Sequence, residues 1–580
     1  MNRLNRRAFL TAAGAAGVAG AATGFGVSLG SGGARAAAGT HPPSLALLHR
    51  GREHGPMGAA GAAAPTAAGT TLETAAAARG HAGYRRLAKG PGWKRVIRNE
   101  LAGGKKGRTD RRITLAAFAQ FTDLHIVDVQ HPLRYEYLRS ETASAWRPQE
   151  ALTIPATVAL IERVNALRHA PATGAPLSFV MTTGDNTDNN SKLELDWFLT
   201  AMSGGPIVPN SGDPKAYEGV QNSGLPLYWQ PESDHRDSDK KIGFPRVDGF
   251  LKAAIREAKS PGLQLPWYST IGNHDLLPGG CYGSSVNGFF ADFAVGGRKL
   301  EELPPEQAAR AWRAVKKGLD PKGRDFEDLL RTHHKKMRGI TPDLRRAPFS
   351  RREYVEAHLD PRNKGAGPVG HGYTRANLME GHLYYTFEVA PGVLGISLDT
   401  TDPGGDYRGS VGTAQLRWLE RMLKQHKDAY TIVFSHHTSR TMTNTQPDPA
   451  APKEKRHDGD EVLALLKDHP KVLAWINGHS HKNKITPHGS LWEISTASHI
   501  DYPQLARIIE LTDNGDGTLS LFTTLIESAA PDHADFTDLT QTGLAALYRE
   551  LAFNAPAPDR REPLTGQPAD RNTELLLQKP

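Results

Sequence analysis

The chain has 580 residues, of which 38% are hydrophobic and 23% are charged. These values are typical of a globular protein with a substantial core, and the length allows one large domain with insertions or two domains. Four arginines near the N-terminus account for four of the +8 formal charges, which leaves about +4, so the charge does not require a nucleic-acid partner. A single cysteine, Cys281, excludes an internal disulfide and a thiolate metal cluster.

The first 38 residues (1–38) resemble a twin-arginine (Tat) signal peptide. The arginine pair lies within Asn5-Arg6-Arg7-Ala8-Phe9-Leu10, and an Ala/Gly-rich apolar run up to about residue 29 follows it. We therefore expect the Tat machinery to export the folded protein to the cell envelope or the extracellular space. The alternative is a disordered Ala/Gly tail with a chance pair of arginines. No later apolar run reaches the ~18 residues of a membrane span, so we expect a soluble mature protein without one.

Two segments of biased composition follow. Residues 39–83 are rich in Ala, Gly, Thr and Pro and are predicted to be a linker. Residues 84–112 are basic and are predicted to be a solvated charged segment, with binding of an anionic substrate or cell-wall polymer as the alternative. Residues 39–112 are thus expected to be a linker and a basic N-terminal segment.

From residue 113 onward, short apolar runs alternate with helical patterns. The runs predicted to be buried strands are 114–122, 177–183, 267–271, 393–398, 431–435 and 472–476. Apolar residues at helical spacing predict helices near 158–167 and 416–423. This alternation predicts an α/β fold, in which ligands bind at the C-terminal ends of the strands.

The α/β domain is predicted to cover residues 113–525, with long insertions at about 189–265 and 276–380. Both insertions are expected to wall the site, and the second, with a helical patch at 306–317, is a candidate for a small cap. Residues 526–580 are polar and Pro-rich apart from a helical patch at 544–553. They are predicted to be a polar C-terminal tail.

Five short motifs carry the chemistry, and each directly follows a predicted strand. They are Asp123-Leu124-His125, Gly184-Asp185-Asn186-Thr187-Asp188, Gly272-Asn273-His274-Asp275, His436-His437 and Gly478-His479-Ser480-His481. Carboxylate, imidazole and amide donors without sulfur suit divalent manganese, iron, zinc or cobalt. Two such metals would share a bridging carboxylate, for which Asp185 is the candidate, and would generate a hydroxide for in-line attack at phosphorus.

The order and spacing of these motifs resemble the calcineurin-like metallophosphoesterase superfamily. The resemblance implies an α/β sandwich of two mixed β-sheets flanked by helices. It also implies that Asp123, His125, Asp185 and His481 hold one metal, and that Asp185, Asn273, His436 and His479 hold the other. His274 would contact the phosphate and either stabilise the transition state or protonate the leaving group, with Asp275 orienting it. Asp188 would support the ligands from behind.

The chain also resembles a narrower group of Tat-exported bacterial metallophosphoesterases, through residues 122–128, 147–153, 183–189 and 501–504. One position departs from the purple acid phosphatases of the superfamily, because Asp188 stands where they carry the iron-binding tyrosine. A purple ferric site is therefore not expected. Within the histidine pair, His437 is the alternative to His436, and Cys281 is expected to be a small buried residue rather than a nucleophile.

The sequence thus predicts an exported, metal-dependent phosphoric ester hydrolase that cleaves phosphomonoesters or phosphodiesters by attack of a metal-bridging hydroxide. A nucleic acid would bind only as a substrate. The alternatives are an extracellular nuclease, favoured by the basic residues 84–112, and a cyclic-nucleotide phosphodiesterase. A non-catalytic binding protein with this fold is a further alternative, although such a protein would be expected to lack some of the ligands.

Overall fold

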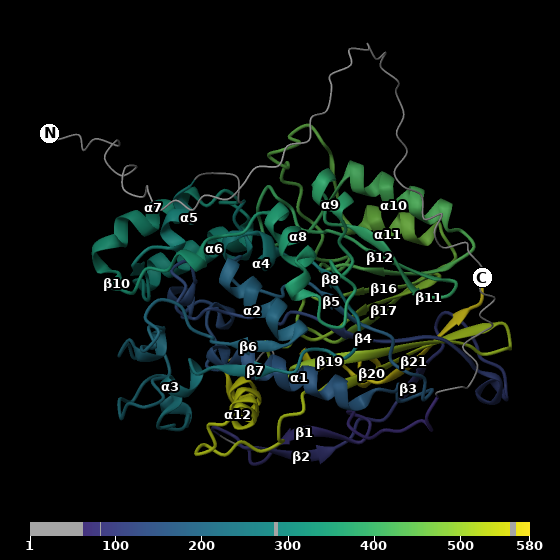
Figure 1. The fold of residues 1–580 in the computed structure, drawn as a ribbon, viewed down its shortest axis with the longest axis horizontal. Coiled ribbons are helices and arrows are strands. Elements are labelled where there is room, and N and C mark those ends of the chain that lie inside the picture. The colour runs from purple at the N-terminus through teal and green to yellow at the C-terminus, as the bar shows by residue number, and fades with distance from the viewer. Residues whose placement is uncertain (1–61, 82, 284–287, 557–563) are drawn as a thin grey trace, which may run out of the picture. The chain divides into compact units, whose positions relative to one another are not determined.

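The computed structural model describes residues 62–81, 83–283, 288–556 and 564–580. The predicted signal peptide and part of the predicted linker lie outside these residues. Two mixed β-sheets with helices against them form the centre of the described chain, which confirms the predicted α/β architecture (Figure 1).

The larger sheet has seven strands. In spatial order they are β3 (Val96–Arg98), β21 (Thr573–Gln578), β20 (Thr518–Glu527), β19 (Leu505–Asp513), β4 (Ile113–Phe121), β5 (Val180–Thr183) and β8 (Trp267–Thr270). Strands β4, β5 and β8 are parallel, whereas β19 pairs antiparallel with β4 and β20. The three parallel strands are those predicted from apolar runs, as expected for strands with packing partners on both faces.

The smaller sheet has six strands. In spatial order they are β11 (Tyr385–Ala390), β12 (Val393–Ser397), β14 (Tyr430–Phe434), β16 (Val472–Asn477), β18 (Leu491–Ser495) and β17 (Lys484–His488). The four central strands run parallel, and the two edge strands run antiparallel to their neighbours. Three of the parallel strands, β12, β14 and β16, are predicted ones.

One hydrophobic cluster joins the two sheets. It includes Phe118 and Met181 of the larger sheet and Phe434 and Ile476 of the smaller one. Phe118 stacks on Phe179, with ring centroids 4.8 Å apart, and meets Phe434 edge-on at 5.8 Å. These aromatic contacts tie the sheets to each other, so strand ends from both sheets reach the same site.

Four helices cover the outer faces of the sheets: α1 (Thr153–Leu167), α2 (Lys192–Ser203), α10 (Thr413–Gln425) and α11 (Gly459–Lys467). Val164 of α1 and Phe198 of α2 pack with Phe121 of the larger sheet. Leu419 of α10 packs with Trp475 of the smaller sheet. Helix α2 lies inside the first predicted insertion, so that segment contributes to the core.

Residues 289–339 form a separate small layer, called the cap below. Its elements are α5 (Phe289–Ala294), β9 (Arg298–Lys299), α6 (Pro305–Lys317), α7 (Arg324–His333) and β10 (Arg338–Gly339). Phe290, Phe326 and Leu330 of the cap share a hydrophobic cluster with Leu133 and Tyr137, which follow β4. The cap thus has its own apolar core, joined to the domain by the chain after β4.

The shorter elements connect these layers. They are β6 (Gly205–Ile207), α3 (Phe250–Ala254), β7 (Ala258–Ser260), α4 (Asn273–Leu276), α8 (Arg351–Leu359), α9 (Arg375–Glu380), β13 (Val411–Gly412) and β15 (Arg456–His457). No helix among the described residues combines the length and apolar character needed to cross a bilayer.

The described parts of the predicted linker, basic segment and polar tail belong to the folded domain, so those three predictions are corrected. Strand β1 (Thr74–Ala78) pairs with β2 (Leu87–Pro91), and β3 pairs with β21 inside the larger sheet. Helix α12 (Gln541–Asn554) is buried along almost its whole length and packs against α1. Its charged residues are buried in ion pairs, such as Glu550 with Arg86, so a polar composition did not mean exposure.

The arginines of residues 84–112 contact the chain itself. Five of them lie over aromatic rings of residues 492–553: Arg85, Arg86, Arg95, Arg98 and Arg112. Arg108 and Arg112 also pair with Glu574. Neither a solvated segment nor an anion-binding patch describes these side chains, because their positive charges face rings and carboxylates of the C-terminal part.

Candidate metal centre

The seven predicted metal donors follow the C-terminal ends of five parallel strands. Asp123 and His125 follow β4, Asp185 follows β5, Asn273 follows β8, His436 follows β14, and His479 and His481 follow β16. Parallel strands present these ends at one edge of each sheet, and the packing of the sheets brings the two edges together. The structure therefore places all seven side chains in one site, while their role as ligands stays a prediction.

Asp185 lies at the centre of this site. Its Oδ2 atom is 3.5 Å from Nε2 of His125 and 3.1 Å from Nε2 of His436. On one side, Nε2 of His481 lies 3.3 Å from Oδ1 of Asp123. This is the arrangement expected of a carboxylate that bridges two metals.

The second donor group lies on the other side of Asp185. Nε2 of His436 is 3.1 Å from Oδ1 of Asn273 and 3.2 Å from Nδ1 of His479. Sets of three donors whose atoms lie within 4.8 Å of one another include Asp123, His125 and His481, and Asp123, Asp185 and His436. These two sets have Asp123 in common, and only the second contains Asp185, so the sharing of Asp185 by two metals stays a prediction.

Two buried atoms of the site show that the donors fit cations. Oδ1 of Asp123 and Nε2 of His125 are buried without a hydrogen-bond partner in the described structure. These atoms lie 4.0 Å apart. Burying a polar atom without a hydrogen bond costs free energy of folding. A divalent cation bound by both atoms would remove that cost. The oxygen and nitrogen donor set therefore fits divalent metal ions.

The backbone of the site is strained at the donor residues. The described chain has ten residues other than glycine with positive φ, and five of them are predicted ligands: Asp123, His125, Asp185, His479 and His481. Their φ angles of 43–59° lie in the left-handed region, which residues with a Cβ atom rarely adopt. Such conformations concentrate at functional sites, where the surrounding structure enforces them.

Electrostatics at the site favours positive charge. Burial alone would lower the pKa of His436, but the Asp185 carboxylate outweighs burial and raises it to about 9. At His481 burial is likewise outweighed, by Asp123 and Asp501, and the pKa rises to about 9. A field that retains protons on two buried imidazoles also attracts a divalent cation.

His436, rather than His437, directs a ring nitrogen, Nε2, at the other predicted donors. Both ring nitrogens of His437 are engaged, with the Thr400 hydroxyl at 2.8 Å and the Tyr407 carbonyl at 3.0 Å. Burial and the neighbouring His436 lower the pKa of His437 to about 3. Although a nitrogen of His437 lies within 4.8 Å of donor atoms on His436 and His479, its hydrogen bonds assign it to support of the loop.

Asp188 holds His125 from behind. Nδ1 of His125 lies 2.8 Å from Oδ1 of Asp188, and the other oxygen of Asp188 pairs with Arg134. Burial would raise the pKa of the Asp188 carboxyl, but Arg134 holds that pKa well below its usual range. Arg134 in turn pairs with Glu150 at 2.7 Å. The contact between Asp188 and His125 is the one that the predicted supporting role of Asp188 requires.

A matching chain of contacts holds His481. Its Nδ1 lies 2.7 Å from Oδ2 of Asp501, and Nε of Arg147 lies 2.6 Å from the other oxygen of Asp501. Residues Asp501 and Arg147 were not predicted to serve the site, although both lie in segments 147–153 and 501–504 that carried the resemblance. Such outer contacts fix the tautomer and orientation of a ligand imidazole. The two sets are called the His–Asp–Arg chains below.

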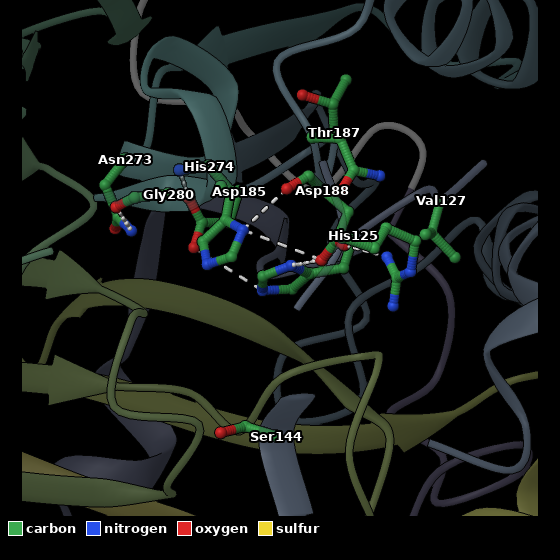
Figure 2. Close-up of polar contacts among 12 residues, drawn as sticks. His125, Val127, Ser144, Asp185, Thr187, Asp188, Asn273, His274 and Gly280 are labelled. Atoms are coloured by element: carbon green, nitrogen blue, oxygen red, sulfur yellow. Dashed lines mark hydrogen bonds and ion pairs between the residues drawn. The ribbon is translucent and has the colours of Figure 1, made fainter. Parts of the chain in front are cut away.

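His274 lies beside the donors, and its predicted contact with the phosphate stays a prediction. Its Nδ1 donates to the backbone carbonyl of Asp188 at 2.8 Å, and its ring packs edge-on against His125 with centroids 4.7 Å apart (Figure 2). Its backbone N–H donates to Oδ1 of Asp185. The ring is thus oriented by a carbonyl next to the first donor group.

Asp275 does not orient the His274 ring, so that prediction is wrong. Its carboxylate accepts from the backbone N–H groups of Thr187 and Gly272, each at 2.8 Å. Burial and the nearby Asp185 raise its pKa to about 6. Asp275 instead ties the loop after β5 to the start of α4, because its buried carboxylate satisfies donors of both segments.

Short stretches of this chain are similar in sequence to known proteins. No family model matches the sequence. The chain is 31% identical over 87 residues to the manganese-dependent ADP-ribose/CDP-alcohol diphosphatase of Xenopus tropicalis, which is 14% of this chain and 24% of that protein. It is 32% identical over 82 residues to the glycerophosphodiester phosphodiesterase GpdQ of Enterobacter lignolyticus, 14% of this chain and 28% of that protein. The chain thus matches about a quarter of the length of these relatives.

Similar solved structures include a dimetal phosphatase from Danio rerio, 12% identical, with a TM-score of 0.35 over 72% of this chain and 99% of the other. A second is the purple acid phosphatase PPD1 of yellow lupin (Lupinus luteus), 11% identical, with a TM-score of 0.24 over 79% of this chain and 55% of the other. The local sequence similarity is to a manganese-dependent diphosphatase and a phosphodiesterase.

Proposed function

We propose that this chain is a calcineurin-like metallophosphoesterase that hydrolyses phosphomonoesters or phosphodiesters with two divalent metal ions. The observation that carries the proposal is the convergence of seven oxygen and nitrogen donors, Asp185 among them, on one site, where buried atoms of Asp123 and His125 make no hydrogen bond. Similarity to a manganese-dependent diphosphatase and a phosphodiesterase supports the same class of reaction.

In this proposal the donors divide into two groups that share Asp185. Asp123, His125 and His481 would complete one metal site, and Asn273, His436 and His479 the other. Two divalent cations bound there would make a water more acidic and offset the negative charge of the phosphoryl oxygens. The His–Asp–Arg chains would keep the imidazoles of His125 and His481 in the tautomer that presents Nε2 to the site.

His274 is the side chain placed to transfer a proton. Its Nδ1 donates to a carbonyl, which can only accept, so the ring can transfer a proton from Nε2 when both of its nitrogens are protonated. Hydrolysis forms a bond from a water oxygen to phosphorus and breaks the bond to the leaving alcohol. The leaving oxygen takes the Nε2 proton, the attacking water releases a proton to solvent, and solvent returns a proton to Nε2 afterwards.

The first test combines metal analysis with two substrates. Protein purified without added metal is analysed for its elements and assayed with p-nitrophenyl phosphate and bis(p-nitrophenyl) phosphate. We expect about two metals per chain, turnover that a chelator abolishes, and a monoester-to-diester ratio that identifies the preferred ester class. Metal-free protein that stays inert after manganese, zinc, iron or cobalt is restored would contradict the proposal and favour a non-catalytic binding protein.

The nuclease alternative loses its main support. It rested on the basic residues 84–112, whose arginines lie over aromatic rings and pair with carboxylates of the same chain. A nuclease would cleave long DNA or RNA with a strong dependence on salt, which the same purified protein can be assayed for. The cyclic-nucleotide alternative is tested by the same diester assay.

We also propose that the Tat machinery exports the protein to the cell envelope or the extracellular space. The twin arginines Arg6 and Arg7 and the small residues at 34–38 support this. The single cysteine also agrees with folding before export. Replacing both arginines with lysine should retain the protein in the cytoplasm, as measured by fractionation, and export of that variant would contradict the proposal.

A further inference from the structure

A cavity of about 500 Å³ opens directly beside the candidate metal centre. One wall consists of site residues, including His125, Asp185, His274 and His481. A second part of the lining, called the apolar wall below, consists of Tyr135, Leu138, Ala145, Trp312, Val315 and Tyr407. Sites for drug-sized organic molecules span roughly 300–1,000 Å³, so the cavity has room for a substantial group besides a phosphate.

The cap contributes two residues of the apolar wall, Trp312 and Val315. Trp312 and Val315 lie three residues apart on α6 and therefore share one face of that helix. Helix α6 contacts the turn of Glu136–Leu138, which supplies Leu138 to the same wall. Trp312 and Val315 are only partly buried, so their remaining surface is free to pack against a ligand.

Two lysines add positive charge to the cavity. Lys316 follows Val315 on α6, and Lys482 follows His481; both line the cavity and are exposed. Neither forms an ion pair with any residue that the structure describes. The lining carboxylate of Asp501 is paired with Arg147 and His481, so it does not neutralise the lysines. The lining of the cavity outside the metal donors thus combines aromatic surface with unpaired positive charge.

We propose that the cavity binds the alcohol part of the substrate, and that this part is an aromatic group carrying a second negative charge. This inference rests on the proposed function, because the scissile phosphate has to occupy the candidate metal centre. Three aromatic rings, those of Tyr135, Trp312 and Tyr407, favour a planar aromatic partner over a small polar alcohol such as glycerol. Lys316 and Lys482 select the second anionic group.

Binding of phosphonates tests this without dependence on leaving-group reactivity. Dissociation constants of methylphosphonate, phenylphosphonate and 4-carboxyphenylphosphonate are measured by calorimetry on the metal-loaded protein. We expect phenylphosphonate to bind about tenfold or more tightly than methylphosphonate, and the added carboxylate to tighten binding by a further several-fold.

Single substitutions identify the residues responsible for each gain in binding affinity. Trp312→Ala and Val315→Ala should each reduce the preference for the phenyl group, while methylphosphonate binds as before and reports an intact site. Lys316→Gln and Lys482→Gln should reduce only the gain from the carboxylate. Leu319→Ala is the matched control, because this cap residue is 67% exposed and does not line the cavity.

The outcomes separate this inference from the proposed function. Equal binding of methylphosphonate and phenylphosphonate by the wild-type protein would overturn the inference and leave the proposed function intact. The inference would also be overturned if Leu319→Ala reduced the preference for phenylphosphonate as much as Trp312→Ala does. Failure of all three phosphonates to bind, together with absence of turnover, would overturn the proposed function itself.

Discussion

Single residues of the candidate metal centre are held in place from several directions. The donor residues Asp123, His125 and Asp185 adopt left-handed backbone conformations, and hydrogen bonds fix their side chains. The His–Asp–Arg chains reach two imidazoles from behind and leave their Nε2 atoms facing other donors. Rigid placement of this kind lets a site bind metal without first reorganising.

His274→Ala separates metal binding from catalysis. Because the His274 ring contacts the carbonyl of Asp188 and is not among the predicted metal donors, the variant should keep both metals. Its turnover should fall by about 10²–10⁴-fold, since proton transfer to the leaving oxygen is lost. Elemental analysis and kcat measure the two effects, with the exposed His334→Ala as a control.

Asp185→Ala should behave differently and lose the metals, because both donor groups depend on this carboxylate. A His274→Ala variant that lost its metals, or that kept the full rate, would contradict the role given to His274.

Arg147→Lys tests the second His–Asp–Arg chain. Lysine keeps the charge but cannot make the two contacts that Arg147 makes with Asp501, so His481 should be held less firmly. We expect metal affinity to fall by about 10–100-fold, measured by competition with a chelator. Arg345→Lys is the matched control, because Arg345 forms a similar pair with Asp343 at the surface. Reduced thermal stability with unchanged metal affinity would mean that Arg147 is only structural.

At the level of elements, the site depends on close approach between the two sheets. The turn after β16 lies against the turn after β4, and Gly478 allows this contact. A Cβ atom at Gly478 would overlap Oγ1 of Thr122 and Oδ2 of Asp123. The glycine of this motif is therefore required by packing next to a donor residue, which explains why it stands directly before His479.

Gly478→Ala should therefore push the two turns apart. We expect a loss of about 1–3 kcal/mol in the free energy of unfolding, together with weaker metal binding, because Asp123 must move. Denaturant titration and metal analysis measure the two effects. Gly103→Ala, whose added Cβ would meet no atom within 4 Å, is the control. Unchanged stability and metal content in Gly478→Ala would show that the turns do not need this contact.

At the level of the whole described molecule, segments far apart in the sequence complete one sheet. Strand β21 near the C-terminus lies between β20 and β3, and α12 packs against α1. Arginines of residues 84–112 lie over rings of the C-terminal part. The domain that carries the site therefore extends well beyond the predicted limits of 113–525.

Leu575→Ala measures this contribution. Leu575 of β21 is fully buried in the cluster between the sheets, so truncation should cost about 2–5 kcal/mol in the free energy of unfolding. Leu344→Ala, at a position that is 82% exposed, should change it by no more than about 0.5 kcal/mol. Similar values for the two variants in denaturant titrations would mean that the C-terminal residues are peripheral.

The sequence by itself determined the α/β class, the parallel strands and the residues that meet at their ends. This was possible because a strand buried on both faces needs a continuous apolar run, and the polar motif after each run has to emerge at the C-terminal edge. The expectation that the five motifs meet at one site therefore required only local patterns and their order, whereas the choice of His436 over His437 rested on the family resemblance. The assignment of residues 114–122 and 472–476 to strands depended on the same rule.

The tertiary structure alone decided the roles of residues whose partners are distant in the chain. Arg147 reaches Asp501, Asp275 binds the loop of Thr187, and the arginines after residue 84 find rings beyond residue 490. No local pattern encodes such a partner, because a charged side chain in an irregular segment has the same sequence signature whether it is solvated or paired. The same reason explains why a polar C-terminal composition concealed a buried helix and a strand of the central sheet.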